Sequence, residues 1–259
     1  MYNITSTSNK TYKFIKSLSQ KKARVEHKCF IVEGIKSVYE TIISDSVVRM
    51  IAINKSSLEK CGDIIRCAES KNVEIYVIDS KIFDALCDTK TPEGAICVTN
   101  MRTNDIKSYK DGLYLYCDKV SDPGNAGTLI RCADAVGAAG VFFSSGSVDI
   151  YNPKTVRATM GSLFHIPVYD NIDKTVLTDM KNKGFSILVG ALDNDALDYR
   201  DVPYKNNTVI IVGNEANGVS DNVIAIADKS VIIPITGRAE SLNVSVAGAI
   251  LMYEWKRNN

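Results

Sequence analysis

The chain has 259 residues, of which 45% are hydrophobic and 24% are charged, which is the balance of an ordinary soluble globular protein and excludes a disordered one. Its longest apolar runs fall far short of the roughly 18 to 20 residues that span a bilayer, and its first residues are polar, so we expect a cytoplasmic protein without a membrane segment. The seven cysteines lack both CxxC spacing and histidine partners, which favours buried reduced thiols over a metal site.

The net charge of +1 conceals two parts of opposite sign. Residues 1–110 hold 18 Lys and Arg against 13 Asp and Glu, a net charge of +5, and residues 111–259 hold 13 against 17, a net charge of −4. Seven basic residues in the first 28 face only one acidic residue: Lys10, Lys13, Lys16, Lys21, Lys22, Arg24 and Lys28. A nucleic acid is the natural partner of such a segment, and the alternative is a solvated amphipathic helix.

Helix and strand patterns alternate through the first 100 residues. They predict helices at 8–23, 35–43, 57–69 and 81–88, and strands at 29–32, 48–53, 74–78 and 95–99. Residues 101–112 are polar and have no clear apolar period. We therefore expect a linker there, between a domain of residues 1–104 and a second domain of residues 105–259.

The second part is predicted to contain six strands, mostly separated by helices. They are expected at 113–117, 140–143, 166–168, 186–190, 209–213 and 230–233. Continuous Val and Ile runs are typical of strands covered on both faces, so a largely parallel sheet is favoured. Ligands of such sheets bind beyond the carboxyl ends of the strands, where three Gly-rich or small polar motifs follow.

The first motif, DPGNAGTLIRCADAVGAAG over residues 122–140, predicts a turn and then a helix. Asn125 is the expected N-cap, and the free N–H groups at the helix start can bind an anion. Arg131 lies outside the apolar stripe of this helix, so its guanidinium can reach into a crevice. The alternative for Arg131 is an i,i+3 ion pair with Asp134.

The second motif, GNEANG over residues 213–218, follows a strand. It is too short for the dinucleotide-binding GxGxxG pattern and lacks the Lys-Ser/Thr of a P-loop, so it gives no support to nucleoside triphosphate binding. Its glycines permit a tight turn around Glu215. This carboxylate could cap the next helix, or accept hydrogen bonds from a ligand or from Arg131, and the sequence leaves these roles open.

The third motif, IPITGRAESLNVSVAGAILMYE over residues 233–254, predicts a strand end, a turn and a helix. Ser241 is the expected N-cap of that helix. Ala247, Gly248 and Ala249 form a small-residue face suited to close packing against another helix or another subunit.

These motifs, together with YNPKTVRATMGSLFHIPV over residues 151–168, resemble the signature motifs of the SpoU/TrmH family of S-adenosylmethionine-dependent RNA 2′-O-ribose methyltransferases, in the SPOUT superfamily. The segments SNKTYKFIKSLSQKKAR, FIVEG and TPEGAICV resemble the substrate-binding domain of its rRNA branch. The resemblance implies an α/β fold in which a C-terminal SPOUT-type, mostly parallel sheet has helices on both faces and a trefoil knot. A smaller α/β RNA-binding domain precedes it. Periodicity alone would exclude a knot, because knots are rare.

The resemblance also implies a site, position by position. S-adenosylmethionine would be held in the knot, largely by backbone contacts, at Gly213, Ile233 and Leu242. The expected catalytic residues are Arg131, Asn125, Glu215, Ser241 and Asn243. Arg157 matches an arginine that is expected to contact RNA phosphate, and it joins Lys10, Lys13, Lys21, Lys22 and Arg24 as an RNA-binding candidate. No metal is implied.

The implied reaction is methyl transfer to a ribose 2′-hydroxyl, with Arg131 activating the 2′-oxygen. His27 and His165 are the only histidines and lie outside the three motifs, so a histidine base is not obvious. Because a guanidinium is a poor base, an electrostatic role for Arg131 is easier to defend.

The leading hypothesis is a methyltransferase of 23S-type large-subunit rRNA that forms a homodimer through its C-terminal domain. A tRNA 2′-O-methyltransferase is one alternative. A non-catalytic RNA-binding or ribosome-assembly protein is another, although such a protein would not need Arg131, Glu215 and Asn243. An antibiotic-resistance methyltransferase would carry the same motifs. The sequence does not indicate which nucleotide is modified, since base choice depends on loops and RNA shape.

Overall fold

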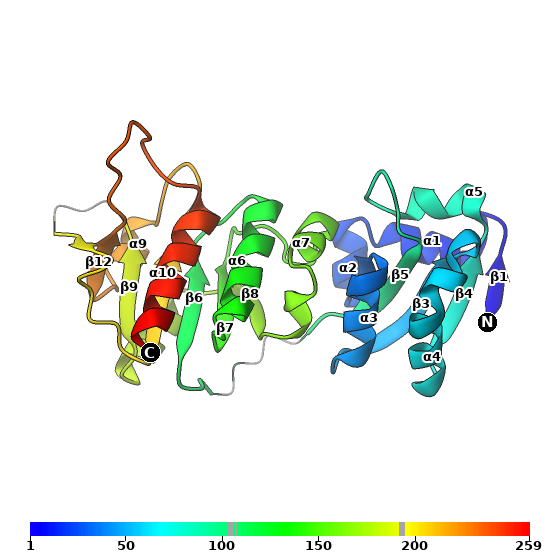
Figure 1. Ribbon diagram of the computed structural model, residues 1–259, viewed down its shortest axis with the longest axis horizontal. Coiled ribbons are helices and arrows are strands. Elements are labelled where there is room, and N and C mark those ends of the chain that lie inside the picture. The colour runs from blue at the N-terminus through cyan, green and yellow to red at the C-terminus, as the bar shows by residue number, and fades with distance from the viewer. Residues whose placement is uncertain (103–105, 107, 192–194) are drawn as a thin grey trace. The chain divides into compact units, whose positions relative to one another are not determined.

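The computed structural model describes residues 1–102, 106, 108–191 and 195–259. The chain forms two compact units, each built around its own sheet (Figure 1). Unit 1 contains Met1–Arg102 and Tyr151–His165, and unit 2 contains Thr103–Ile150 and Ile166–Asn259. The expected boundary between residues 104 and 105 lies outside the described residues.

Unit 1 has a five-stranded mixed sheet in the order β1-β4-β3-β5-β2. The β1, β4 and β3 strands run parallel, and β5 pairs antiparallel with both β3 and β2. Its elements are β1 (Tyr2–Ile4), α1 (Lys10–Ser17), α2 (Lys21–His27), β2 (Cys29–Glu33), α3 (Ile35–Ile43), β3 (Val48–Asn54), η1 (Lys55–Ser57), η2 (Glu59–Cys61), α4 (Gly62–Ser70), β4 (Glu74–Ile78), α5 (Ser80–Phe83), η3 (Asp84–Leu86), β5 (Ala95–Asn100), α7 (Pro153–Ala158) and η4 (Ser162–Phe164).

The four predicted strands of unit 1 are confirmed to within one residue, but the single helix predicted at 8–23 is wrong. Two helices, α1 and α2, replace it, and Leu18 is the C-cap of α1. The Arg24 guanidinium donates to the carbonyls of Leu18 and Ser19 at 2.9 and 2.8 Å, which satisfies acceptors at the end of α1. The edge strand β1 was not predicted, because three residues are too short to show an alternating pattern.

The segment Tyr151–His165 packs with unit 1, although the sequence indicates a continuous second domain over residues 105–259. The rings of Tyr151 and Phe30 lie 4.6 Å apart, and the Phe164 ring stacks on Phe30 at 6.3 Å. Arg102 donates its backbone N–H to the Tyr151 hydroxyl at 3.1 Å. Aromatic burial therefore attaches this segment to β2, a contact that no local pattern indicates.

Unit 2 has a seven-stranded sheet in the order β10-β12-β9-β11-β6-β7-β8, and every strand pair in it is parallel. The expected mostly parallel sheet is confirmed. Its elements are β6 (Leu113–Cys117), α6 (Pro123–Ala135), β7 (Gly140–Ser144), β8 (Val168–Ile172), α8 (Thr175–Asn182), β9 (Ser186–Gly190), β10 (Leu197–Asp198), β11 (Thr208–Val212), α9 (Asp221–Ile224), β12 (Lys229–Ile232) and α10 (Val244–Asn258).

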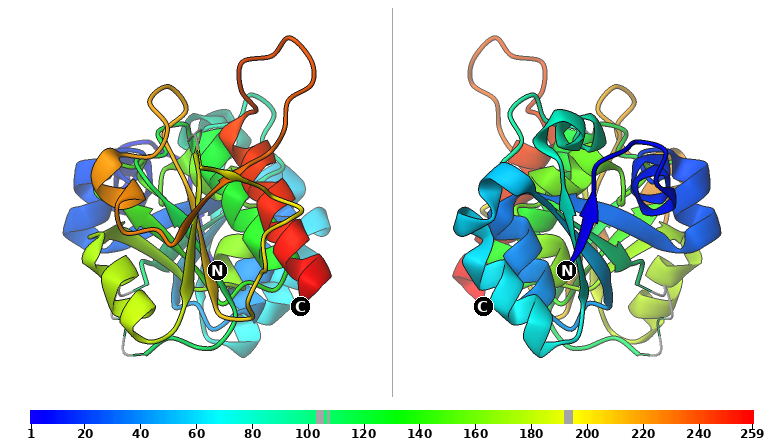
Figure 2. Two further views of the ribbon diagram at one scale, coloured as in Figure 1. Left: turned by 90° about the vertical axis from the view of Figure 1, so that its left-hand side faces the viewer. Right: turned by 90° about the vertical axis from the view of Figure 1, so that its right-hand side faces the viewer.

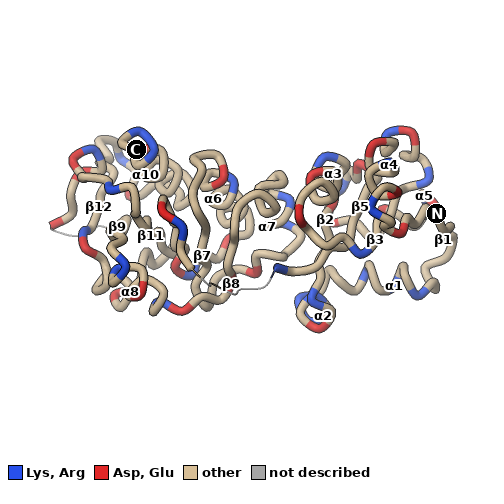
Figure 3. The backbone as a smooth tube through the Cα atoms, turned by 90° about the horizontal axis from the view of Figure 1, so that it is seen from below, with Lys and Arg blue, Asp and Glu red and all other residues tan. Residues whose placement is uncertain are grey.

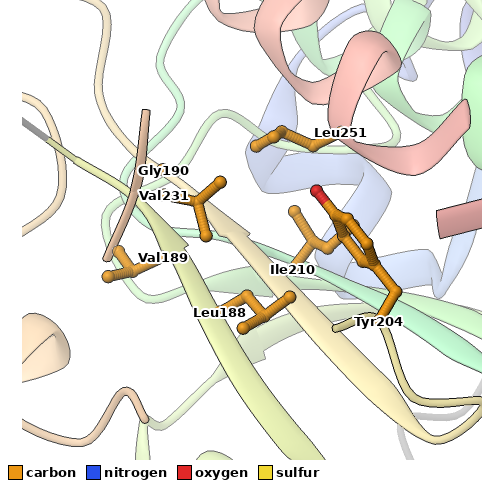
Figure 4. Close-up of a pocket in the computed structure, with 7 residues that line it drawn as sticks. All are labelled: Leu188, Val189, Gly190, Tyr204, Ile210, Val231 and Leu251. Atoms are coloured by element: carbon orange, nitrogen blue, oxygen red, sulfur yellow. The ribbon is translucent and has the colours of Figure 1, made fainter. Parts of the chain in front are cut away.

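Helices cover both faces of this sheet (Figure 2). Leu177 and Met180 of α8 and Val223 of α9 share one apolar cluster with residues of the central strands. On the opposite face, α10 packs against α6 and β11. There Leu251 of α10 lies over Leu188, Ile210 and Val231 of the sheet, beside Tyr204 (Figure 4).

One strand expectation in unit 2 needs correction, and one strand of this unit was not predicted. The strand expected at 166–168 begins at Val168 and runs to Ile172, and the two-residue β10 was too short to predict. Among the described residues, no helix is long and apolar enough to cross a membrane, and no group of three or more potential metal ligands is present. All seven cysteines are free thiols.

Candidate active site

The first two motifs meet because β6 and β11 are neighbouring parallel strands. Cys117, at the end of β6, pairs with Val212, at the end of β11, and the Asp118 N–H donates to the Val212 carbonyl at 2.8 Å. The turns that follow therefore leave the sheet at the same edge, which is the expected ligand edge of a parallel sheet. Residues about 90 positions apart in the chain are brought together there.

The helix of the first motif begins one turn earlier than expected. Asp122 is the N-cap of α6, and its Oδ1 accepts the backbone N–H of Asn125 at 2.8 Å. Asn125 is therefore not the cap, and the expectation that it would be is wrong. The physical reason is Pro123, which favours the first helical position because it has no N–H to satisfy.

The Glu215 carboxylate accepts hydrogen bonds from the first motif through both of its oxygens. Its Oε2 accepts from the backbone N–H and the hydroxyl of Ser121 at 3.1 and 2.7 Å. Its Oε1 accepts from the Asp122 N–H and from the Asn125 amide, both at 3.0 Å. Burial raises the pKa of this carboxyl, but the hydrogen bonds from Asn125, Ser121 and Asp122 outweigh it and lower the pKa to about 2. Glu215 is thus a fixed anion that holds the turn before α6.

The third motif joins this network through Asn243. Its Nδ2 donates to Oδ1 of Asn125 at 2.9 Å, while Nδ2 of Asn125 donates to Glu215. The Asn243 Oδ1 also accepts the backbone N–H of Ser245 at 2.9 Å, so Asn243 is the N-cap of α10. The expectation that Ser241 caps this helix is wrong. One chain of hydrogen bonds therefore links all three motifs.

The anionic state of Glu215 predicts a pH-dependent stability. A carboxyl whose folded pKa lies near 2 and whose unfolded pKa lies near 4.5 stabilises the fold fully above about pH 4.5, and it loses this contribution as the pH falls toward 2. Both oxygens of Glu215 accept hydrogen bonds from backbone N–H groups. In Glu215→Gln the side-chain NH₂ group must therefore face one of these N–H donors, which is left without an acceptor. We expect a lower melting temperature for Glu215→Gln at pH 7, and a difference from wild type that shrinks below pH 4.5.

Thermal unfolding followed by circular dichroism from pH 3 to pH 7 measures this difference. Glu240→Gln is the matched control, since Glu240 is an exposed glutamate of the same unit. An equal difference between wild type and Glu215→Gln at pH 3 and at pH 7 would contradict the assigned ionisation.

Backbone packing shapes the turn of the second motif. Asn214 and Gly218 exchange two backbone hydrogen bonds of 2.9 Å, and Gly218 has a φ of +68°. A Cβ on Gly213 would lie 2.2 Å from the Gly218 carbonyl carbon, a distance at which the backbone must move. Gly213 is therefore required by the turn itself, as well as being a candidate for cofactor contact.

The expected cofactor and arginine positions on unit 2 differ in exposure, and Gly213 is the buried one. Arg131 is exposed on α6, and Ser241 and Leu242 are exposed in the segment between β12 and α10, where 37% of Leu242 is accessible. Ile233 is half-buried at the end of β12. Backbone polar groups beside an accessible leucine fit an adenosyl group, which needs hydrogen bonds at its edge and apolar contact on its face.

Two residues that hold the site were not predicted from the sequence. Asp118 is 2% exposed, and its carboxylate accepts from the N–H and hydroxyl of Ser220 at 2.8 and 2.6 Å. Asn214 donates from Nδ2 to the Lys119 carbonyl at 2.9 Å and accepts the Ala216 N–H at 3.0 Å. Their positions directly after the β6 strand and inside the GNEANG turn were the available signals.

The structure separates the six RNA-binding candidates into three groups. Lys10, Lys13, Lys21 and Lys22 are exposed on α1 and α2, whose basic residues are marked in Figure 3. Arg24 is only 2% exposed, because its guanidinium donates to the carbonyls at the end of α1. Its assignment to RNA is therefore corrected to a structural role. Arg157 forms a 2.8 Å ion pair with Asp88 within unit 1.

The small-residue face of the last helix is used inside the chain. A Cβ on Gly248 would lie 2.6 Å from a methyl group of Leu129 on α6, so Gly248 permits the close approach of α10 to α6. The outer face of α10 leaves apolar side chains accessible, with Val246 48% and Tyr253 54% exposed.

Models of known families match both parts of the chain. The SpoU rRNA Methylase family model matches residues 112–253, and the MRM3-like substrate binding domain model matches residues 9–97. The AdoMet-bound rRNA methyltransferase from Sinorhizobium meliloti resembles the structure with a TM-score of 0.88 at 28% identity, over 98% of this chain and 97% of that one.

Two curated relatives carry defined names. The chain is 34% identical over 253 residues to the 23S rRNA (guanosine(2553)-2′-O)-methyltransferase RlmP of Bacillus subtilis, with 98% of each chain covered. It is 36% identical over 153 residues to the tRNA (guanosine(18)-2′-O)-methyltransferase of Aquifex aeolicus, with 58% of this chain and 71% of the relative covered. With a family model over more than half of its residues and a relative of this identity along its whole length, the chain belongs to the SpoU rRNA Methylase family.

Proposed function

We propose that this enzyme transfers the methyl group of S-adenosylmethionine to a ribose 2′-hydroxyl of large-subunit ribosomal RNA. The observation that carries the proposal is the hydrogen-bonded chain from Glu215 through Asn125 to Asn243, because it assembles three family motifs at one edge of the sheet, beside α6. A non-catalytic RNA-binding protein would not need this assembly. AdoMet-bound relatives of the same fold support the cofactor.

Each part of the site has a chemical task in this proposal. When bound, S-adenosylmethionine supplies a methyl group on a sulfonium leaving group. The backbone at Gly213, Ile233 and Leu242 would hold the adenosyl part. The Arg131 guanidinium stays protonated, so it would bind the phosphate next to the target ribose and stabilise negative charge developing on the 2′-oxygen. Asn125, Glu215, Ser241 and Asn243 would position the turn and the ribose.

Division of labour between the two units follows from their charge and from the family models. Residues 1–104 would select the RNA, and residues 105–259 would carry out methyl transfer. The exposed lysines of α1 and α2 and the match to a substrate-binding domain support the first role. Arg157 would add a phosphate contact by exchanging its partner Asp88 for RNA.

Ribosomal RNA is favoured over transfer RNA by the extent of similarity. The rRNA relative matches 98% of the chain, whereas the tRNA relative matches 58% of it. The basic unit 1 would therefore serve an rRNA substrate. An antibiotic-resistance role would use the same site and differ only in the nucleotide modified.

The C-terminal segment would be threaded through a trefoil knot. One contact supports this topology: the Trp255 indole N–H on α10 donates to the carbonyls of Lys205 and Asn206 at 3.0 and 3.2 Å, so α10 lies against the segment that leads into β11.

A homodimer through unit 2 would cover the apolar outer face of α10 formed by Val246 and Tyr253. Sedimentation at micromolar concentration tests it, and a monomer would contradict it. The free thiols fit a cytoplasmic location, where the rRNA substrate is found.

Mapping of 2′-O-methyl groups in total RNA tests the function as a whole. We expect one position in 23S rRNA to lose its methyl group in cells that lack the protein, and to regain it when the protein is restored. The guanosine that corresponds to the target of the Bacillus subtilis relative is the first position to inspect. A change confined to tRNA, or no change at all, would contradict the proposal.

A further inference from the structure

An aromatic pair lies at the open edge of the unit 1 sheet. Tyr2 of β1 and Tyr76 of β4 are paired in register, and their rings stack with centroids 5.3 Å apart and an interplanar angle of 29°. Tyr2 is 55% exposed. Since β1 is the edge strand of this sheet, no other strand among the described residues covers the outer side of Tyr2.

The inner ring of the pair is fixed by its surroundings. Tyr76 is half-buried against the apolar cluster that includes Ile4 and Ile78, and its hydroxyl donates to Glu74 at 2.8 Å. A single exposed apolar residue is unremarkable, but two stacked rings with one free face form a rigid flat surface. Such a surface suits another aromatic ring.

Helix α1, which carries exposed lysines, packs on the same apolar cluster as Tyr76. Tyr12 and Ile15 of α1 belong to this cluster, and Tyr76 packs against it. Lys10 and Lys13 of this helix are both exposed. Figure 2 shows β1 and α1 on this side of unit 1 in its right-hand view.

We propose that Tyr2 and Tyr76 form a stacking platform for one unpaired base of the RNA substrate, while Lys10 and Lys13 contact the neighbouring phosphates. Proteins recognise single-stranded RNA by this combination, because aromatic rings stack on bases and cations bind the backbone. The Glu74 carboxylate at the rim repels phosphate, so the RNA backbone lies on the α1 side of the platform. The inference rests on the proposed function in that the substrate is RNA.

Binding of the full chain to two labelled RNA probes tests the platform. One probe is a single-stranded oligouridine of about 12 nucleotides, and the other is an abasic oligomer of equal length, which keeps the phosphates and lacks the bases. We expect Tyr2→Leu to weaken oligouridine binding about tenfold and to leave the abasic probe unaffected. Tyr2→Phe keeps the ring and should bind as wild type does. Lys13→Ala should weaken binding of both probes.

The outcomes separate the platform from the wider RNA assignment. If Tyr2→Leu binds oligouridine normally while Lys13→Ala binds both probes weakly, the platform is wrong and RNA binding by unit 1 stands. If neither variant changes binding, the assignment of RNA to this unit fails as well. An equal loss for both probes in Tyr2→Leu, with an unchanged circular dichroism spectrum, would also overturn stacking.

Discussion

Replacement of Arg131 by alanine is expected to lower methyl transfer by about 100-fold to 1,000-fold while S-adenosylmethionine still binds. Arg131 lies on the exposed face of α6, whereas the candidate cofactor contacts fall on the turns after β11 and β12. In the proposed mechanism, removal of the guanidinium takes away charge stabilisation at the 2′-oxygen and leaves the proposed cofactor-binding backbone intact. Because Arg131 is exposed, the substitution should not change the melting temperature measurably.

Two assays run side by side check this expectation. Transfer of a tritiated methyl group to RNA measures turnover, and calorimetric titration measures cofactor affinity. Arg131→Lys keeps the charge but loses the two-pronged contact with phosphate, so partial activity is expected. Arg66→Ala is the control for loss of an exposed arginine, since Arg66 forms a local ion pair with Asp63 in unit 1. Full activity of Arg131→Ala would remove Arg131 from the catalytic role.

Substitution of Gly213 by alanine should abolish cofactor binding and destabilise unit 2. The added Cβ would lie 2.2 Å from both the carbonyl carbon of Gly218 and the N–H nitrogen of Val219, and neither backbone atom can move without opening the turn. Opening the turn displaces Glu215 and with it the anchor of Asn125. We expect cofactor affinity to fall by about 100-fold or more, because the backbone proposed to bind the cofactor is rearranged.

Gly218→Ala is the matched control at the other end of the same turn. A Cβ there meets nothing within 4 Å, and only the φ of +68° opposes it, so the expected cost is about 1 kcal/mol. Calorimetric titration and thermal unfolding of both variants measure the contrast. If Gly213→Ala and Gly218→Ala have the same affinity for cofactor, close packing at Gly213 does not control the site.

The strands of unit 2 were predictable because runs of consecutive apolar residues in the sequence indicate their burial. Continuous apolar runs such as VIIV cannot be stable in water, and in an α/β protein they become strands covered on both faces. The roles of the two glycines in the second motif also followed from the sequence, since Gly213 lies at the end of a strand and Gly218 closes a turn. Short edge strands such as β1 and β10 were not predicted, because two or three residues are too few to show a hydrophobic period.

The N-caps of α6 and α10 were predicted within the correct motifs but on the wrong residues. Asp122 and Asn125 are both good N-caps, as are Ser241 and Asn243, and intrinsic preference does not rank them. In the structure Asp122 and Asn243 are the N-caps, so the Asn125 side chain can link Asn243 to Glu215 by hydrogen bonds. The burial of Arg24 could not be predicted either, because charged residues are almost always exposed unless their hydrogen-bond donors are satisfied. Here the carbonyls six and five residues earlier in the chain accept hydrogen bonds from its guanidinium.

By itself, the sequence determined the alternation of helices and strands, the parallel character of the second sheet and the identity of the motif residues. These properties depend on neighbouring residues, through hydrophobic period and turn chemistry. Only the tertiary structure decided that Tyr151–His165 packs with unit 1, and that Glu215 holds Asn125 from 90 positions away while Asn243 reaches Asn125 across 118. Such contacts depend on which strands become neighbours, and strand order results from packing of the whole chain, which no short segment encodes.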